Sequence, residues 1–192
     1  MKVCVYCASS AKLASVYLDA TAEIARLLVE HGCQIAYGGG SLGLMGKLAD
    51  VVVEMGGDIT GIMPHFMKDV EWAHPKVEKF VFTADMRERK AKLLEGVDAV
   101  LALPGGTGTL DELFEVITLK RLGQFNKPIV IVSTNGFYEP LKALFQKCQD
   151  EQFMSSRNLG CWTFVETPEE IIPAIENAPP WGDDAITFAV NQ

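Results

Sequence analysis

Residues 98–121 read Asp-Ala-Val-Leu-Ala-Leu-Pro-Gly-Gly-Thr-Gly-Thr-Leu-Asp-Glu-Leu-Phe-Glu-Val-Ile-Thr-Leu-Lys-Arg, an apolar run that passes through glycines into a helical pattern. The run up to Leu103 is typical of a buried strand, and apolar residues recur at helical spacing from Leu113 onward. A strand that ends in glycines and restarts as a helix lets backbone N–H groups approach an anion, and the helix dipole favours negative charge there. The stretch therefore predicts a phosphate-binding loop, with the carboxylate of Glu112 in the first helical turn beside it.

The rest of the chain repeats this alternation of short apolar runs and longer segments of helical period. Strands alternating with helices indicate a parallel sheet covered on both faces, a doubly wound, Rossmann-like α/β fold. We expect one domain over residues 1–178 and a C-terminal tail over 179–192, because Pro and Gly interrupt the helical pattern after Ala178. The expected strands and helices, in chain order, cover 3–6, 16–31, 34–37, 44–55, 59–63, 79–82, 86–95, 99–103, 110–122, 129–132, 138–149, 162–165 and 168–175.

Composition narrows the classes of function. The 192 residues are 48% hydrophobic, which suffices for one substantial core. The formal net charge of -8 argues against binding to nucleic acid or to an anionic membrane, since both need basic surface. No stretch approaches the roughly 20 apolar residues of a membrane span, and the first residues lack the layout of a signal peptide. We expect a cytoplasmic protein.

The five cysteines are odd in number and scattered, which is typical of reduced thiols rather than of a disulfide framework. Cys4-x-x-Cys7 has the spacing of a redox site or of half a zinc site, but no second pair of this spacing follows. We interpret Cys4 as a buried strand residue and expect no metal.

In doubly wound sheets, ligands bind outside the carboxyl ends of the strands, near the point where the strand order reverses. The residues that could bind a ligand or take part in catalysis do follow expected strands: 7–10, 38–46, 64–65 and 104–112. The longest irregular stretch, 64–75, mixes aromatic, acidic and His residues, as binding loops often do.

The second glycine-rich segment allows two interpretations. Gly38-x-Gly40-x-x-Gly43 matches the dinucleotide fingerprint, but Asp58, the acidic residue near the required spacing, stands at the wrong end of its strand. The glycines then either face a nucleotide or serve only a tight turn and close packing. Neither glycine loop continues into the Gly-Lys-Ser or Gly-Lys-Thr of an ATP-hydrolysing phosphate loop.

Glu112 has a structural alternative, because Thr109-x-x-Glu112 has the spacing of a helix capping box. A capping box needs neither Pro104 nor three glycines, and Gln would cap as well as Glu. We therefore favour a functional Glu112, although the two roles can coexist.

A third segment, Asp85-Met-Arg-Glu-Arg-Lys90, begins a helix after an expected strand. Alternating charge on a helix is usually a solvated face. Here a guanidinium can instead point into the crevice that holds the glycine loops. Arginine suits a phosphate or a purine plane because its fork is planar, permanently charged and able to form paired hydrogen bonds.

Together, Gly38-Gly-Gly-Ser-x-Gly-Leu-Met-Gly46, Met86-x-Glu-Arg-Lys90 and Pro104-Gly-Gly-x-Gly-Thr-x-x-Glu112 resemble the "lonely guy" (LOG) family of cytokinin riboside 5'-monophosphate phosphoribohydrolases. The opening Cys4-Val-Tyr-Cys-Ala-Ser-Ser10 is similar too. The resemblance implies a homodimer that cleaves purine nucleoside 5'-monophosphates, AMP or N6-prenyl-AMP, into free base and ribose 5-phosphate, without a cofactor.

Carried over by position, the resemblance implies that Arg89 and Glu112 are catalytic. One departure is Arg87, where family members often carry His. Arg89 is also expected to contact the nucleotide. The other expected nucleotide-contacting residues, three of which lie in the loops after the first two strands, are Ser10, Gly39, Gly40, Glu71, Lys90, Gly105, Gly106, Thr107, Gly108, Thr109 and Thr118.

The implied chemistry is coherent with these residue types. Glycosidic cleavage passes through an oxocarbenium-like state, which the carboxylate of Glu112 can stabilise while it orients or deprotonates water. The leaving purine develops negative charge, which Arg89 can stabilise. A molybdenum-cofactor carrier of Rossmann-like fold remains the alternative, because such carriers have similar glycine loops. The motifs do not support the label "possible lysine decarboxylase" that family members often carry, since pyridoxal phosphate enzymes need a Schiff-base lysine.

Overall fold

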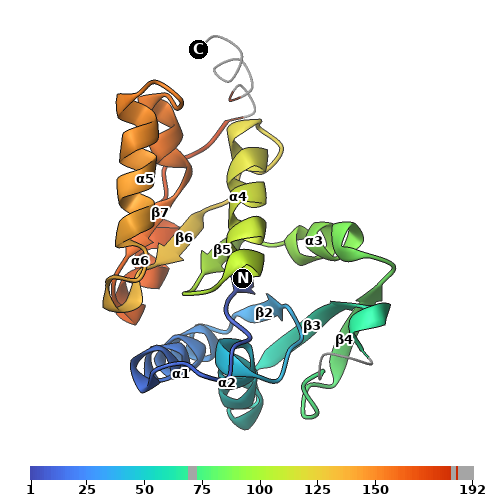
Figure 1. The fold of residues 1–192 in the computed structure, drawn as a ribbon. Helices are drawn as coiled ribbons and strands as arrows, with labels where there is room; N and C mark the ends of the chain where they lie inside the picture. Colours follow the sequence, from blue (N-terminus) through green and yellow to red (C-terminus); the bar gives the residue numbers. More distant parts are fainter. Residues whose placement is uncertain (69–72, 183–184, 186–192) are drawn as a thin grey trace.

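Seven parallel strands form one sheet in the computed structural model, which describes residues 1–68, 73–182 and 185 (Figure 1). Their spatial order is β4-β3-β2-β1-β5-β6-β7, and every neighbouring pair is parallel. The predicted doubly wound, Rossmann-like α/β fold is therefore confirmed. The strands are β1 (Lys2–Tyr6), β2 (Gln34–Tyr37), β3 (Asp58–Pro64), β4 (Lys79–Thr83), β5 (Ala99–Ala102), β6 (Ile129–Val132) and β7 (Thr163–Val165).

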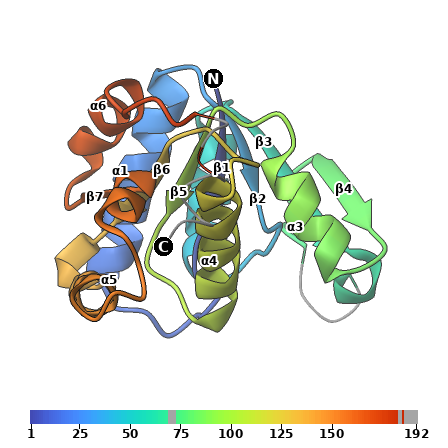
Figure 2. The same ribbon diagram turned by 90° about the horizontal axis from the view of Figure 1, so that it is seen from above.

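Helices cover both faces of the sheet (Figure 2). Their bounds are α1 (Ser15–Glu30), α2 (Gly43–Glu54), α3 (Met86–Leu94), α4 (Thr107–Arg121), α5 (Glu139–Asp150) and α6 (Ile171–Glu176). Four short 3-10 turns complete the described elements: η1 (His65–Met67), η2 (Thr134–Gly136), η3 (Ser156–Cys161) and η4 (Pro168–Glu170).

The sheet separates two apolar cores. Val3 and Val5 of β1 pack with α1, α2 and α6, whereas Cys4 and Tyr6 of the same strand pack with α3, α4 and α5. This alternation follows from the period of two along a strand. Because both faces are covered, the central strands read as unbroken apolar runs in the sequence.

The strand order reverses at β1. Val3 lies opposite Ile35 of β2 on one side and opposite Ala99 of β5 on the other. The chain after β1 runs to α1, and the chain after β5 runs to α4 on the opposite face of the sheet. The two connections diverge there, and a crevice opens at their carboxyl ends, as the position of the glycine motifs predicted.

The expected elements are all present, with two differences in detail. The predicted helix 110–122 begins earlier, at Thr107, so the glycine loop itself supplies the first helical turn. The last predicted helix, 168–175, starts as the 3-10 turn η4, whose N-cap Thr167 forms a capping box with Glu170, and only then continues as α6.

The start of the tail packs against the carboxyl-terminal part of α4. The indole Nε1 of Trp181 donates a hydrogen bond of 2.6 Å to the carbonyl of Lys120. The ammonium of the buried Lys120 lies 5.7 Å from the same ring and donates to the carbonyl of Lys127. Trp181 thus anchors the start of the tail to the domain, and most of the expected tail after residue 182 lies outside the described residues.

All five cysteines are free, and the two of the Cys-x-x-Cys spacing pack into different cores, Cys4 beneath α3 to α5 and Cys7 beneath α1 and α2. Burial raises the pKa of both thiols well above the usual cysteine range, so both are protonated at neutral pH. Within residues 1–68, 73–182 and 185, no His, Cys, Asp and Glu side chains gather in a metal-binding group. None of the helices described is both long and apolar enough to cross a bilayer.

Candidate active site

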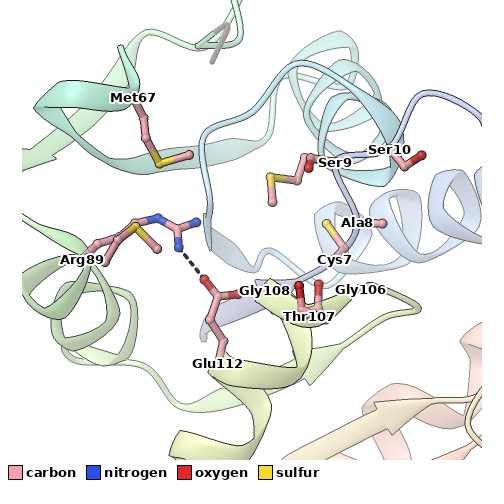
Figure 3. Close-up of a pocket in the computed structure, with 13 residues that line it drawn as sticks. Cys7, Ala8, Ser9, Ser10, Met67, Arg89, Gly106, Thr107, Gly108 and Glu112 are labelled. Carbon is pink, nitrogen blue, oxygen red and sulfur yellow. Dashed lines mark hydrogen bonds and ion pairs between the residues drawn. The ribbon is translucent and has the colours of Figure 1, made fainter. Parts of the chain in front are cut away.

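A cavity of about 310 Å³ opens at the carboxyl ends of β1 and β5. The loop after β1, residues 7–10, forms one wall, and the start of α4, residues 106–109, forms the adjoining one (Figure 3). Side chains from α2, η1 and α3 close the remaining sides. The cavity therefore lies where the strand order reverses, and three of the sequence motifs contribute to it.

A buried ion pair, Arg89 of α3 and Glu112 of α4, lies on the cavity wall (Figure 3). The guanidinium Nη1 is 2.5 Å from Oε1 of Glu112, and the two residues are only 5% and 7% exposed. Arg89 Nε also donates a hydrogen bond of 3.0 Å to the carbonyl of Ile62 at the end of β3. Two partners on different elements thus fix the guanidinium plane next to the cavity.

The glycine loop after β2 makes room for this arginine. A Cβ built on Gly38 would lie 2.5 Å from Nη2 of Arg89, too close for a real contact. Further along, Gly43 has a φ of +61°, and its Cβ would lie 2.5 Å from the carbonyl oxygen of Ser10. At these two positions glycine allows close packing, which was one of the two interpretations of this segment from the sequence.

The start of α4 has the features of an anion site. Its N-cap is Gly106, which has no side chain, so no side chain caps the helix. The first N–H groups of a helix have no partner within the helix, and the dipole adds partial positive charge there. Thr107 and Gly108, the first two helical residues, line the cavity. A phosphate fits this wall.

The capping box considered as a structural alternative for Thr109 and Glu112 does not form. Because α4 begins at Thr107, Glu112 is its sixth residue and lies in the second turn, not in the first. Its carboxylate bonds Arg89 instead of a backbone N–H at the helix start. The physical reason is the early start of α4: Glu112 lies beyond the first turn, and its buried carboxylate pairs with the guanidinium of Arg89.

Burial controls the protonation of Glu112. Removal from water raises the pKa of its carboxyl above the usual glutamate range, and the charge and hydrogen bond of Arg89 oppose part of that rise. A carboxyl with a raised pKa in a cavity exchanges a proton more readily near neutral pH than an ordinary glutamate does. Glu112 can therefore act as an acid or base as well as stabilise positive charge.

The structure brings together seven of the residues that the sequence assigned to nucleotide binding or catalysis. These seven line one cavity: Ser10, Arg89, Gly106, Thr107, Gly108, Thr109 and Glu112. They come from the ends of β1 and β5 and from α3, which are far apart in the chain. Glu71, the expected substrate-contacting glutamate, lies outside the described residues.

Five other assigned residues do not line this cavity, and one of them, Thr118, lines a separate groove between α4 and α5. Lys90 turns its ammonium toward Asp111 and Glu115 of α4, and Thr118 donates its hydroxyl to the carbonyl of Phe114. Gly105 forms the tight turn before α4, where a Cβ would collide with the side chain of Thr109.

The remaining two belong to the loop after β2. Gly39 has a φ of +86° and packs beside Phe80, and Gly40 packs beside Met45. Arg87, the residue that departs from the family pattern, is exposed and does not line the cavity either.

Sequence reasoning missed the methionines Met45, Met67 and Met86, which also line the cavity. Met86 carried a usable signal, because it lies three residues before Arg89 and thus on the same helix face. Met45 and Met67 carried no comparable signal, since an apolar residue next to a loop is usually part of a core.

Comparisons with known proteins identify relatives of this chain. Residues 45–175 match the model of a family described as "possible lysine decarboxylase". The chain is 39% identical to the probable cytokinin riboside 5'-monophosphate phosphoribohydrolase LOGL1 of Oryza sativa subsp. japonica, over 91% of this chain and 78% of that one. It is 36% identical to the cytokinin riboside 5'-monophosphate phosphoribohydrolase LOG5 of Arabidopsis thaliana, over 96% and 81%.

Among solved structures, the molybdenum cofactor carrier protein of Chlamydomonas reinhardtii superposes with a TM-score of 0.70. It is 19% identical, and the match covers 92% of this chain and 96% of that chain. At this identity the likeness establishes a shared fold and nothing about the ligand.

Proposed function

The chain belongs to the LOG family of phosphoribohydrolases, and from this we propose that it hydrolyses the N-glycosidic bond of purine nucleoside 5'-monophosphates, AMP or N6-prenylated AMP. The products are the free base and ribose 5-phosphate. One observation carries the proposal: a buried Arg89–Glu112 pair and an uncapped helix start line the same cavity.

The proposed substrate pose follows from the charges of the walls. The 5'-phosphate binds the N–H groups at the start of α4, one helical turn before Glu112. The ribose then lies against the carboxylate of Glu112, and the base lies toward Arg89. Phosphate binding remote from the reacting bond holds the sugar in place, which lowers the entropic part of the barrier.

In the proposed reaction, the bond between the anomeric carbon and the base nitrogen breaks as water attacks that carbon. The carboxylate of Glu112 stabilises the positive charge that develops on the sugar and takes a proton from the water. The guanidinium of Arg89 stabilises the electron pair that leaves with the base. A proton taken up by the base completes the products.

Two other functions fit the residues less well. In the described part of the chain, no lysine side chain lines the cavity, although pyridoxal phosphate chemistry requires a Schiff-base lysine. A cofactor carrier needs neither a buried carboxylate with a raised pKa nor an arginine fixed against it. Hydrolysis uses both groups.

Product analysis tests the proposal directly. Wild-type protein is incubated with AMP and with N6-isopentenyl-AMP at equal enzyme concentration, and free base and ribose 5-phosphate are measured. The proposal predicts equal amounts of the two products from a cleaved nucleotide. Binding of both nucleotides without release of base would support the carrier instead.

We also propose that the chain forms a homodimer in the cytoplasm. An apolar groove of about 200 Å³ runs between α4 and α5, where Phe114 and Leu144 are 38% and 52% exposed. A second copy that covered this groove would remove apolar surface from water. The five free cysteines suit a compartment that keeps thiols reduced. Light scattering of Leu144→Asp tests the dimer, since a charge in the covered groove would yield monomers.

A further inference from the structure

The chain after β6 reaches the β5–α4 loop, residues 103–106, which leads into the start of α4. The hydroxyl of Tyr138 donates a hydrogen bond of 2.8 Å to the carbonyl of Leu103, the first residue of that loop. We propose that Tyr138 is a positioning residue for phosphate binding: its hydroxyl holds the β5–α4 loop so that the N–H groups at the start of α4 face the 5'-phosphate. This inference rests on the proposed function, whose substrate pose it extends.

The β5–α4 loop borders two cavities. Gly106 lines the cavity of the candidate active site (Figure 3). Pro104, Gly105 and Gly106 also line a second, apolar cavity of about 240 Å³, together with Phe137. Two consecutive glycines have no side chains to pack, and their backbone is free to adopt many conformations. The position of the loop therefore depends on hydrogen bonds to its backbone.

These hydrogen bonds reach the loop from both neighbouring strands. The N–H of Leu103 donates to the carbonyl of Tyr6 at 2.9 Å, and the N–H of Ala8 donates to the carbonyl of Pro104 at 3.2 Å. Both of these bonds connect the loop to β1 and the residue that follows Cys7. Tyr138 supplies a bond from the chain after β6. Because β5 lies between β1 and β6, the loop is held on two sides.

Tyr138 is itself fixed in place and is only 2% exposed. Its N–H donates a hydrogen bond of 3.0 Å to Oγ of the buried Ser133, and its ring meets Phe137 edge to face at 4.9 Å. Between them, Asn135 and Gly136 have φ of +54° and +69°, and this turn carries Tyr138 back to the end of β5. A left-handed conformation costs free energy at Asn135, and such strain is typical of segments that position a functional site.

The hydroxyl of Tyr138 remains a donor across the pH range of an assay. Burial raises the pKa of the phenol well above the usual tyrosine range, so the oxygen keeps its proton. Phenylalanine at this position would keep the ring and remove the donor. A buried carbonyl without a donor is costly, so the carbonyl of Leu103 would turn toward another partner. The glycines permit that movement, and the first N–H groups of α4 would move with it.

Such a movement weakens phosphate binding selectively. An anion at a helix start depends on N–H groups that point at its oxygens. Adenosine lacks the phosphate and does not use these groups, so its affinity should not change. A tyrosine that only stabilised the fold would affect the binding of AMP and of adenosine alike. The two ligands therefore distinguish a positioning role from a structural one.

Binding without turnover tests the inference. In the Glu112→Gln background, calorimetry gives the dissociation constants of AMP and of adenosine, and their ratio measures what the phosphate adds to affinity. We expect Tyr138→Phe to lower this ratio about tenfold, through weaker binding of AMP alone. Ser133→Ala, which removes the acceptor of the Tyr138 N–H, should lower the ratio in the same direction.

Tyr37→Phe is the matched control. Tyr37 is also fully buried at the carboxyl end of a strand, but among the described residues its hydroxyl has no hydrogen-bond partner. We expect this variant to keep the parent ratio. Melting temperatures check that each variant is folded, and Ser133→Ala carries the test if Tyr138→Phe unfolds at the assay temperature.

Several results would overturn the inference. They are a parent that binds AMP no better than adenosine, a folded Tyr138→Phe with an unchanged ratio, equal weakening of both ligands, and an equal loss in Tyr37→Phe. Failure of the proposed function gives a different result: wild-type protein that releases no base from AMP, while the ratio still depends on Tyr138.

Discussion

At the scale of single residues, the site depends on one arginine that is held from three sides. Glu112 and the carbonyl of Ile62 bond Arg89, and the missing side chain of Gly38 leaves space for its Nη2. In the sequence, Arg89 is one of several charged residues on a helix. The interpretation of these charges as a solvated face holds for Arg87 and Glu88, which are exposed, but not for Arg89, which is buried. Periodicity identifies the face of a helix but not the depth to which a long side chain is buried.

Gly38→Ala is expected to lower kcat by up to about 100-fold, because the added Cβ displaces the guanidinium from the leaving base and small misplacements have effects of this size. Steady-state kinetics with AMP measures the loss. In an Arg89→Lys background, which lacks Nη2, the same substitution should have little further effect. If the two losses multiply as independent effects, Gly38 does not act through Arg89.

The pH dependence of activity follows from Glu112. In the proposed reaction Glu112 acts in its carboxylate form, and burial raises its pKa, so kcat/KM should fall as the pH decreases through this raised pKa. The acidic limb is therefore expected above the usual range of a glutamate. A pH profile of kcat/KM with AMP measures it, and a limb at or below the ordinary glutamate pKa contradicts the assignment.

At the scale of elements, the starts of α3 and α4 determine the site in opposite ways. The side chain of Asp85 caps α3 and so fixes the turn that carries Arg89, whereas α4 has Gly106 at its N-cap and leaves its N–H groups for a ligand. The early start of α4 at Thr107 was not predictable from local propensity, because Gly108 disfavours a helix interior. The packing of Leu113, Val116 and Ile117 on the sheet stabilises the helix.

Asp85→Ala should destabilise the fold by about 1 kcal/mol, the usual effect of losing an N-cap. For a domain of this size, the melting temperature should fall by about 2–4 °C. Asp85→Asn keeps an acceptor for the N–H of Glu88 and should remain near wild type. Thermal unfolding followed by circular dichroism compares the three proteins, and equal destabilisation by Ala and Asn would contradict the capping role.

At the scale of the whole molecule, the fold was predictable because the strands inside the sheet are largely buried on both faces, whereas only the edge strands β4 and β7 are mostly exposed or half-buried. Glycines or segments of helical periodicity bound these strands in the sequence. The location of the site was predictable for the same reason, since parallel strands bring their carboxyl ends to one edge. The methionines that line the cavity were not predictable, because Met45, Met67 and Met86 are separated in sequence and meet only through tertiary packing. The packing role of the glycines was not predictable either, because it depends on the atoms that lie opposite each missing Cβ.

The central claim is that Glu112 and Arg89 form a cleavage site rather than a structural ion pair. Glu112→Gln tests it most directly, because Gln keeps the size and an acceptor for Arg89 but removes the negative charge. Release of adenine and ribose 5-phosphate from AMP is measured for wild type and variant, with AMP binding and melting temperature as controls for folding. We predict that the variant binds AMP and releases base at least about 100-fold more slowly. A folded Glu112→Gln protein that releases base as fast as wild type would contradict the account.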